Sequence, residues 1–166
     1  PQIRKDLAYF GEFGVRCFFY YVDDLSRSIS ASLGIDHEWR MILVGLGSMG
    51  RSLLRHHGMR MHGYRIVGAY DTDELNIGQT IADVTVQSLS ALEDPATPLN
   101  AEIGVITTRP DKAQEATDKL VASGVCAILN FTSSRLTVPP HVFVEYVDFL
   151  HHLYALSFNL STMRAE

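Results

Sequence analysis

The segment Arg40–Gly50, RMILVGLGSMG, decides the fold of this chain. Its first half is a continuous apolar run, which is typical of a strand that is buried on both faces. Its second half spaces Gly45, Gly47 and Gly50 as G-x-G-x-x-G. In such a unit the first glycine permits a tight turn, the second lets the backbone approach a pyrophosphate, and the third lets helix and strand pack closely. The segment therefore predicts a strand, a glycine-rich turn and a helix over 48–61.

An acidic residue favours a dinucleotide as the ligand of this turn. Asp71 ends a second predicted strand, Tyr64–Asp71, about 20 residues after Gly50, where a carboxylate accepts hydrogen bonds from an adenosine ribose. The start of the helix offers free N–H groups to the phosphates. Because a carboxylate at this place repels a 2′-phosphate, NAD(H) is favoured over NADP(H). Two alternatives stay open, a related loop that binds coenzyme A and a tight turn without a ligand.

Strand and helix patterns alternate along the rest of this region. Further strands are expected at 83–87, 102–107, 125–131 and 142–147, and a helix is expected at 111–123 with Ala113, Ala116, Leu120 and Val121 facing inward. The segment 92–99 is expected to be a loop. Alternation of this kind predicts an α/β fold with a Rossmann-type, doubly wound parallel sheet.

Two strand ends carry polar residues that a dinucleotide needs for its further contacts. Thr107, Thr108 and Arg109 end one strand, and Asn130 and Phe131 end another. Each of these residues could equally serve the turn in which it lies. Arg109 could reach a phosphate, and a solvent-facing side chain is the favoured interpretation.

Composition and charge exclude several classes of protein. The chain has 166 residues, of which 46% are hydrophobic and 20% charged, so wholesale disorder is excluded. No apolar run approaches the roughly 20 residues of a membrane helix, so we expect no membrane partner. Cys17 and Cys126 are interpreted as reduced thiols of a cytoplasmic protein. The net charge of -5 argues against a chain that is basic throughout, without excluding a local basic patch.

The residues of a hydride-transfer enzyme are missing from the pattern. No Tyr-x-x-x-Lys sequence occurs, and none of the seven histidines stands at a strand end beside an acidic partner. The adjacent pairs His56-His57 and His151-His152 lack a third ligand, so no metal site is expected. We therefore expect a protein that is not an enzyme, in which the cofactor acts as a signal. A small NAD-dependent oxidoreductase stays open as an alternative.

The two ends of the chain differ from the middle. Gln2–Phe10 has helical spacing of apolar residues, Val15–Val22 is aromatic-rich and extended, and a connector helix follows. The tail Phe149–Leu160 (FLHHLYALSFNL) is apolar on more than one face of a helix. Such a helix must be buried, and a partner chain is the favoured cover.

Three segments resemble a known family. Gln2–Gly11 (QIRKDLAYFG) resembles the end of the winged-helix domain of the Rex family of redox-sensing transcriptional repressors. Ile128–Phe131 (ILNF) and Val147–Phe149 (VDF) are similar to two further segments of that family, and the resemblance runs over essentially the whole chain. It implies a homodimer with an exchanged C-terminal helix. This dimer binds operator DNA and leaves it when NADH binds, and NAD⁺ competes weakly.

The resemblance also implies domains and residue roles. The domains are a partial winged helix (1–22), a linker helix (23–38), a Rossmann domain (39–148) and a dimerisation helix (149–166). The pyrophosphate would be held by Gly45, Gly47, Ser48, Met49 and Gly50, and the ribose by Asp71. The nicotinamide half would lie near Thr107, Thr108, Asn130 and Phe149. DNA would be contacted by Arg4, Lys5, Tyr9 and Arg16. The redox switch and the subunit interface would include Asp148, Phe149 and Tyr154.

The N-terminal segment departs from the family pattern. Cys17 and Phe19 stand where the family has wing glycines, which puts the fit of the wing to DNA in question. Only the recognition helix and the wing of the winged helix are present, so the resemblance implies about 45 or more residues upstream of Pro1. We expect this chain to bind NAD(H) and to dimerise, but to bind DNA poorly.

Overall fold

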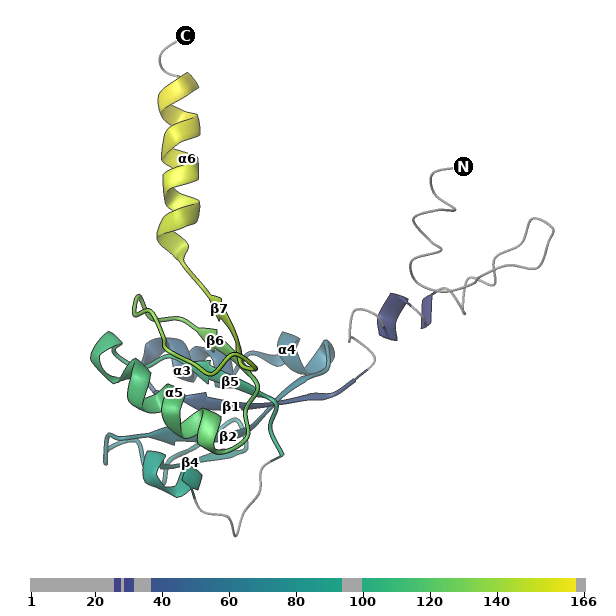
Figure 1. The fold of residues 1–166 in the computed structure, drawn as a ribbon, viewed down its shortest axis with the longest axis vertical. Helices are drawn as coiled ribbons and strands as arrows, with labels where there is room; N and C mark the ends of the chain where they lie inside the picture. Colours follow the sequence, from purple (N-terminus) through teal and green to yellow (C-terminus); the bar gives the residue numbers. More distant parts are fainter. Residues whose placement is uncertain (1–25, 28, 32–36, 94–99, 164–166) are drawn as a thin grey trace, which may run out of the picture. The chain divides into compact units, whose positions relative to one another are not determined.

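An open sheet lies at the centre of the fold (Figure 1). The structure is a computed structural model that describes residues 26–27, 29–31, 37–93 and 100–163. The strands within these residues are β1 (Trp39–Val44), β2 (Tyr64–Asp71), β3 (Thr80–Ile81), β4 (Val84–Ser88), β5 (Ile103–Ile106), β6 (Ala127–Asn130) and β7 (Phe143–Tyr146). The helices are α3 (Ser48–Leu54), α4 (His57–Met61), α5 (Ala113–Ala122) and α6 (Phe149–Met163), with 3₁₀ turns η2 (Leu89–Glu93) and η3 (Pro110–Lys112).

The strand order is β3-β4-β2-β1-β5-β6-β7. The pairs β2–β4, β1–β5, β5–β6 and β6–β7 run parallel, with Leu43 opposite Val105 and Val105 opposite Leu129. Apart from β3, this is the 3-2-1-4-5-6 order of a doubly wound dinucleotide fold, so the predicted fold class is confirmed. In such a sheet, ligands bind outside the carboxyl ends of the strands where the order reverses, here between β1 and β5.

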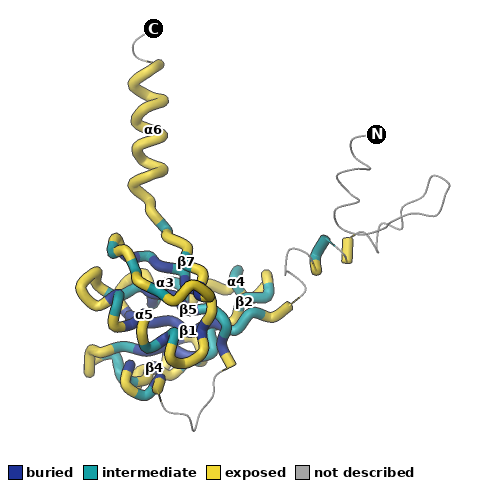
Figure 2. The backbone as a smooth tube through the Cα atoms, viewed as in Figure 1, coloured by how far each residue is buried: buried dark blue, intermediate teal, exposed yellow. Residues whose placement is uncertain are grey.

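The core forms where the apolar strands meet one face of α5. Residues 41–44 of β1 are buried, and Ala113, Ala116 and Leu120 of α5 are fully buried, as the periodicity predicts (Figure 2). A Cβ atom added at Gly104 of β5 would lie 2.7 Å from Cδ1 of Leu120. The absence of a side chain at Gly104 therefore lets α5 pack closely on the sheet.

We expect Leu120→Ala to lower the free energy of unfolding by about 2–5 kcal/mol, because the rigid sheet cannot close the cavity. Urea denaturation followed by circular dichroism measures this change. The matched control is Leu75→Ala, since the Leu75 side chain is 79% exposed and its truncation should cost less than about 0.5 kcal/mol. Equal losses in the two variants would contradict this packing.

Several predicted boundaries are wrong in detail. The single helix expected over 48–61 is two helices, because the His56 N–H donates to the Leu53 carbonyl and so leaves the i→i−4 pattern of α3. The strand expected at 83–87 is β4 at 84–88, and the first residues of the expected loop at 92–99 belong to η2. Residues 94–99 lie outside the described part.

Strand β3 has no counterpart in the prediction, and it pairs antiparallel with β4. Ala82 and Asp83 connect the two strands with φ values of 47° and 70°. Positive φ at both central residues is the conformation that a two-residue hairpin turn requires. The fully parallel sheet of the prediction therefore gains a short antiparallel edge.

The chain divides into two compact units, Pro1–Trp39 with His57–Arg65, and Arg40–His56 with Ile66–Glu166. In the first unit the N–H of Trp39 donates to the Gly63 carbonyl at 2.7 Å. Residues 26–27 and 29–31, within the expected linker helix, are helical. The second unit holds most of the sheet and the cleft described below. The domain boundaries drawn from the sequence stay predictions.

Among the described helices, none has the length and apolar character needed to cross a bilayer.

Candidate dinucleotide site

A cleft of about 420 Å³ lies at the carboxyl ends of β1, β2 and β5. Its volume is within the usual range for small-molecule sites, about 300–1,000 Å³. Predicted ligand residues that line it are Gly45, Gly47, Asp71, Thr107 and Thr108. They come from three separate segments of the chain, and the strand order brings them together at its reversal point.

Two of the three glycines are required by the protein's own packing. Gly45 has a φ of +102°, and a Cβ atom there would lie 2.7 Å from the backbone of Thr107 and Thr108. A Cβ atom on Gly50 would overlap the carbonyl oxygen of Gly45. These contacts explain the first and third glycines as devices for the tight turn and for close packing.

Gly47 is different, because the protein itself does not require a glycine there. Its φ of -68° is accessible to any residue, and no atom lies within 4 Å of an added Cβ. Gly47 is exposed and lines the cleft. The empty space beside its backbone is the space that a closely approaching pyrophosphate would occupy.

Asp71 binds the glycine-rich turn directly. Its Oδ2 accepts hydrogen bonds from the Leu46 N–H at 2.7 Å and from Nδ2 of Asn76 at 2.8 Å. Its Oδ1 accepts from the N–H groups of Thr72 and Asp73. The carboxylate therefore fixes the turn, and a ribose hydroxyl would have to share or replace one of these four donors.

Arg51 completes a closed circuit of hydrogen bonds around the same turn. Its Nε donates to the Leu46 carbonyl at 3.1 Å, and its Nη2 donates to Oδ1 of Asn76 at 2.5 Å and to Gln79 at 3.0 Å. Since Asn76 also bonds to Asp71, both the N–H and the carbonyl of Leu46 are held by side chains. Side-chain hydrogen bonds therefore hold the glycine-rich turn on both sides of Leu46.

The two threonines after β5 line the cleft, and Thr107 also holds the glycine-rich turn. Oγ1 of Thr107 donates to the Gly45 carbonyl at 2.7 Å, and Oγ1 of Thr108 donates to the Arg109 carbonyl at 3.1 Å. Asn130 does not line the cleft. Its amide is buried, accepts from the Thr132 N–H and donates to the Ser134 carbonyl. A direct contact of Asn130 with a ligand stays a prediction.

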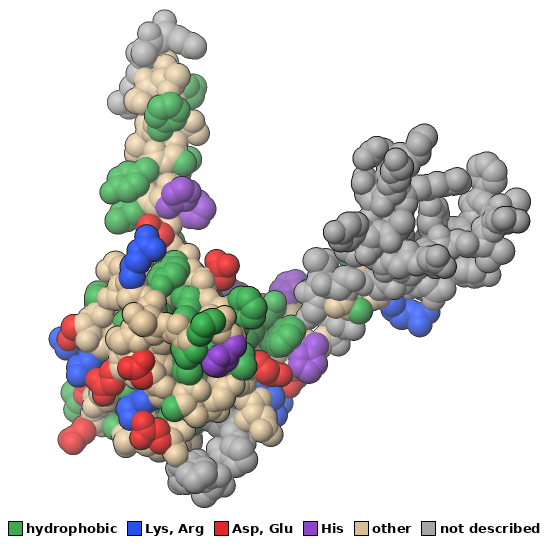
Figure 3. Space-filling model, viewed as in Figure 1, with side chains coloured by type: hydrophobic (Ala, Val, Ile, Leu, Met, Phe, Trp, Pro, Cys, Tyr) green, Lys and Arg blue, Asp and Glu red, His purple; other side chains and the backbone are tan. Residues whose placement is uncertain are grey.

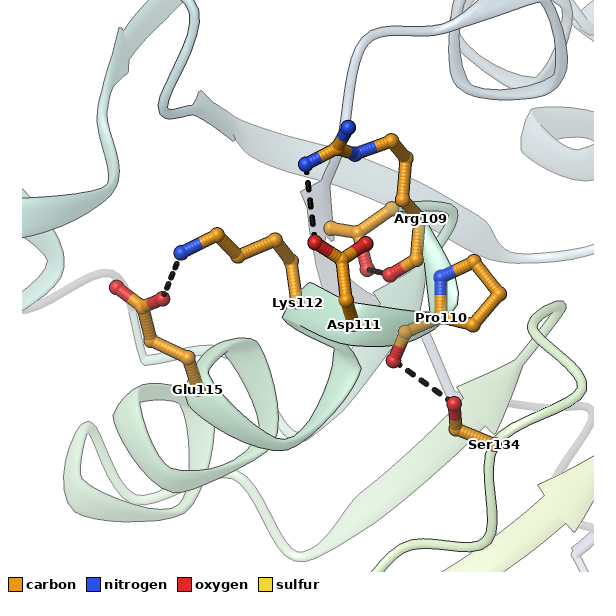
Figure 4. Close-up of polar contacts among 7 residues, drawn as sticks. Arg109, Pro110, Asp111, Lys112, Glu115 and Ser134 are labelled. Atoms are coloured by element: carbon orange, nitrogen blue, oxygen red, sulfur yellow. Dashed lines mark hydrogen bonds and ion pairs between the residues drawn. The ribbon is translucent and has the colours of Figure 1, made fainter.

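Three charged side chains, those of Arg109, Lys112 and Glu115, line the cleft. Figure 4 shows the ion pairs that they form. Nη2 of Arg109 lies 3.0 Å from Oδ2 of Asp111, and Nζ of Lys112 lies 3.1 Å from Oε2 of Glu115. The backbone here is held separately, because Oγ of Ser134 donates to the Pro110 carbonyl at 2.8 Å. The backbone beside Arg109 is therefore held in place, whereas the Arg109 side chain at the cleft is largely exposed.

The predicted switch residues lie at the start of α6. Oδ1 of Asp148 accepts from the Leu150 N–H at 2.9 Å, as a helix-capping side chain does. Asp148 and Phe149 line a second hollow of about 450 Å³ with residues after β6 and β7. Every described residue of α6, Tyr154 included, is exposed in the single chain (Figure 2).

Other predicted roles lie elsewhere. The proposed DNA-contacting residues Arg4, Lys5, Tyr9 and Arg16 are outside the described residues. Within the described part no cluster of His, Cys, Asp or Glu side chains could hold a metal ion.

Burial raises the pKa of Tyr70, whose side chain packs in the core. Ser48, Met49 and Gly50 belong to the turn and α3 but do not line the cleft.

Sequence reasoning missed Arg51, Asn76, Lys112 and Glu115. Lys112 and Glu115 follow Arg109 at the start of a predicted helix, so helical spacing could have brought them to the same cleft. Asn76 gives no such signal, because the fold of the segment after β2 alone brings it to Asp71.

Comparison with known proteins assigns the chain to a family. Residues 36–134 match the family described as CoA binding domain. The redox-sensing transcriptional repressor Rex of Solidesulfovibrio magneticus is 50% identical over 165 residues, which are 99% of this chain and 75% of the relative. The chain belongs to the Rex family. The Rex protein of Desulfitobacterium hafniense is 44% identical over 99% of this chain and 78% of its own length.

Solved Rex-family structures agree with the fold. The repressor RSP in complex with β-NAD⁺ and operator DNA superposes with a TM-score of 0.85 at 32% identity, covering 99% of this chain and 76% of that one. RSP in complex with β-NADH gives a TM-score of 0.82 at 30% identity, covering 99% and 76%. Rex proteins are named as transcriptional repressors, which confirms the expectation of a regulator rather than an enzyme.

Proposed function

We propose that this chain represses transcription by binding operator DNA as a homodimer, and that NADH bound in the cleft releases it from DNA. The observation that carries the ligand is Gly47, which lines the cleft and has empty space where a side chain would stand. The Rex-family structures that contain β-NADH, or β-NAD⁺ with operator DNA, support the same ligand pair and partner. Acting on operator DNA would place the protein in the cytoplasm.

The residues of the cleft are suited to the adenosine and pyrophosphate of NAD(H). Gly47 would leave room for the pyrophosphate and Gly45 would form the tight turn, with the N–H groups of Ser48 and Met49 at the start of α3 nearby. Asp71 would bind the adenosine ribose and disfavour a 2′-phosphate. Thr107, Thr108, Asn130 and Phe149 stay our proposal for the nicotinamide side. When bound, the nicotinamide reports the redox state by the presence or absence of its hydride.

The homodimer is supported by the exposed apolar side chains of α6. They include Phe149, Leu150, Leu153, Tyr154, Leu156, Phe158 and Leu160, and they are exposed in the single chain (Figure 3). An isolated helix of 15 residues is marginal in water, so α6 needs packing to be stable. A second copy of the chain would supply that packing by exchanging its own α6.

Release from DNA by NADH tests this function. A fluorescent duplex carrying the operator of the RSP complex is mixed with enough of the protein to saturate it, at a fixed low salt concentration, because affinity for DNA depends steeply on salt. NADH should lower the anisotropy to the value of free duplex, whereas the same concentration of NAD⁺ should not. The Gly47→Ala variant should bind the duplex and should need roughly fivefold to 150-fold more NADH for release. Anisotropy unaffected by NADH in the unsubstituted protein would contradict the proposal.

Coenzyme A is a second candidate ligand, favoured by the match of residues 36–134 to the CoA binding domain family. Coenzyme A also carries adenosine and a pyrophosphate, which the glycine-rich turn could hold in the same way. Competition distinguishes the two ligands. If NADH is the ligand, a tenfold excess of coenzyme A should displace little of it. Displacement at equal concentration would favour the alternative.

A further inference from the structure

More acidic than basic side chains line the cleft, which disfavours a bound pyrophosphate unless a cation lies near it. The acidic side chains that line the cleft are Asp71, Asp73 and Glu115, whereas Arg109 and Lys112 are the only basic ones among its lining residues. A bound pyrophosphate would add two negative charges to this surface. The N–H groups of the turn carry only partial charges, so a full positive charge near the phosphates would improve binding.

Arg109 is attached close to the place where the pyrophosphate would lie. It directly follows Thr107 and Thr108, whose backbone atoms lie within 2.7 Å of a Cβ built on Gly45. Its own carbonyl accepts a hydrogen bond from Thr108, and the next carbonyl, that of Pro110, accepts one from Ser134. The backbone is therefore anchored beside the glycine-rich turn.

The side chain of Arg109, in contrast, is held only by a weak contact. Its described partner is Asp111 at 3.0 Å, and the two side chains are 77% and 59% exposed. An ion pair as exposed as this contributes about 0–1 kcal/mol. Giving it up would therefore cost little, and a charge-assisted, bidentate bond to a phosphate is stronger. Figure 4 shows the guanidinium turned toward Asp111.

Lys112 is the weaker candidate for this role. It lies in the 3₁₀ turn after Arg109 and pairs with Glu115, which also lines the cleft. Its ammonium group is a point charge without the planar fork that matches two phosphate oxygens.

We propose that Arg109 is a ligand-binding residue of the site, and that its guanidinium leaves Asp111 to bind the pyrophosphate of the dinucleotide. This inference rests on the function proposed above. Asp111 then competes with the ligand for Arg109, so the ion pair seen here lowers the affinity that the cleft would otherwise have.

A double-mutant cycle tests the exchange of partners. NADH is titrated into the unsubstituted protein, Arg109→Gln, Asp111→Asn and the double variant, with thermal unfolding measured for each. Arg109→Gln should weaken binding about tenfold, and Arg109→Lys should be intermediate. Asp111→Asn should tighten binding, because Arg109 is freed, and this gain should vanish in the double variant. Arg60→Gln on α4 is the matched control and should bind as the unsubstituted protein does.

Adenosine, which carries no phosphate, separates a phosphate contact from one to the base. It should bind the Arg109→Gln variant and the unsubstituted protein equally, and a loss with adenosine too would overturn the pyrophosphate contact. Unchanged NADH binding in Arg109→Gln would overturn the inference and leave the proposed function intact. A gain from Asp111→Asn that persists in the double variant would also overturn it, as a general charge effect. Failure of the unsubstituted protein to bind NADH would remove the proposed function as well.

Discussion

Gly47→Ala should weaken NADH binding strongly while leaving the fold intact. The added methyl group meets no protein atom within 4 Å, so the free energy of unfolding should fall by less than about 1 kcal/mol. In the complex, the same methyl group would stand where the pyrophosphate approaches the backbone. Steric conflict of this kind costs about 1–3 kcal/mol, which corresponds to roughly fivefold to 150-fold weaker binding. Nicotinamide fluorescence measures the affinity.

Gly50→Ala is the comparison that makes the result informative. Its methyl group would overlap the Gly45 carbonyl, so this variant should lose stability as well as affinity. The glycine-rich turn thus contains one position that serves the ligand and another that serves the fold. Gly47→Ala protein that binds NADH as tightly as the unsubstituted chain would contradict this division.

Leu153→Glu combined with Leu156→Glu should convert the homodimer to a monomer. Both side chains are exposed apolar groups of α6 in the single chain. In a dimer each buried leucine contributes roughly 1.5–3 kcal/mol, and a carboxylate at a buried position adds a desolvation cost. Sedimentation should therefore give the 18.5 kDa mass of one chain instead of twice that value.

Leu75→Glu is the matched control, because Leu75 is an exposed leucine outside α6. It should sediment as the unsubstituted chain does. If the double α6 variant stays a dimer, or if the unsubstituted chain is a monomer, the role of α6 as the subunit interface is contradicted. Circular dichroism should show loss of helix in the monomer, since α6 alone is marginal in water.

The main elements of the fold could be predicted because their signals are local. Tyr64–Asp71 is β2 with the expected bounds, and the inward positions of α5 follow from a period of 3.6 residues. The break between α3 and α4 could not be predicted, since it depends on the His56 N–H donating to the Leu53 carbonyl. The hairpin to β3 depends on positive φ values at Ala82 and Asp83. This pair lacks the glycine that usually marks a two-residue hairpin turn in a sequence.

The candidate site could be predicted in part. The glycine spacing and Asp71 locate the cleft, because strand ends of a doubly wound sheet converge at its reversal point. The sequence does not show that Asp71 already accepts four hydrogen bonds, or that Arg51 and Asn76 close a circuit around Leu46. Such contacts depend on three-dimensional loop geometry and have no periodicity to reveal them.

Redox sensing by this chain is tested most directly by titration with NADH and with NAD⁺ under identical conditions. Nicotinamide fluorescence reports NADH binding, and displacement of NADH reports NAD⁺ binding. We expect NADH to bind at least about fivefold more tightly than NAD⁺, because regulation of this kind corresponds to a free-energy difference of about 1–3 kcal/mol. NADH that binds no more tightly than NAD⁺ would contradict a redox sensor.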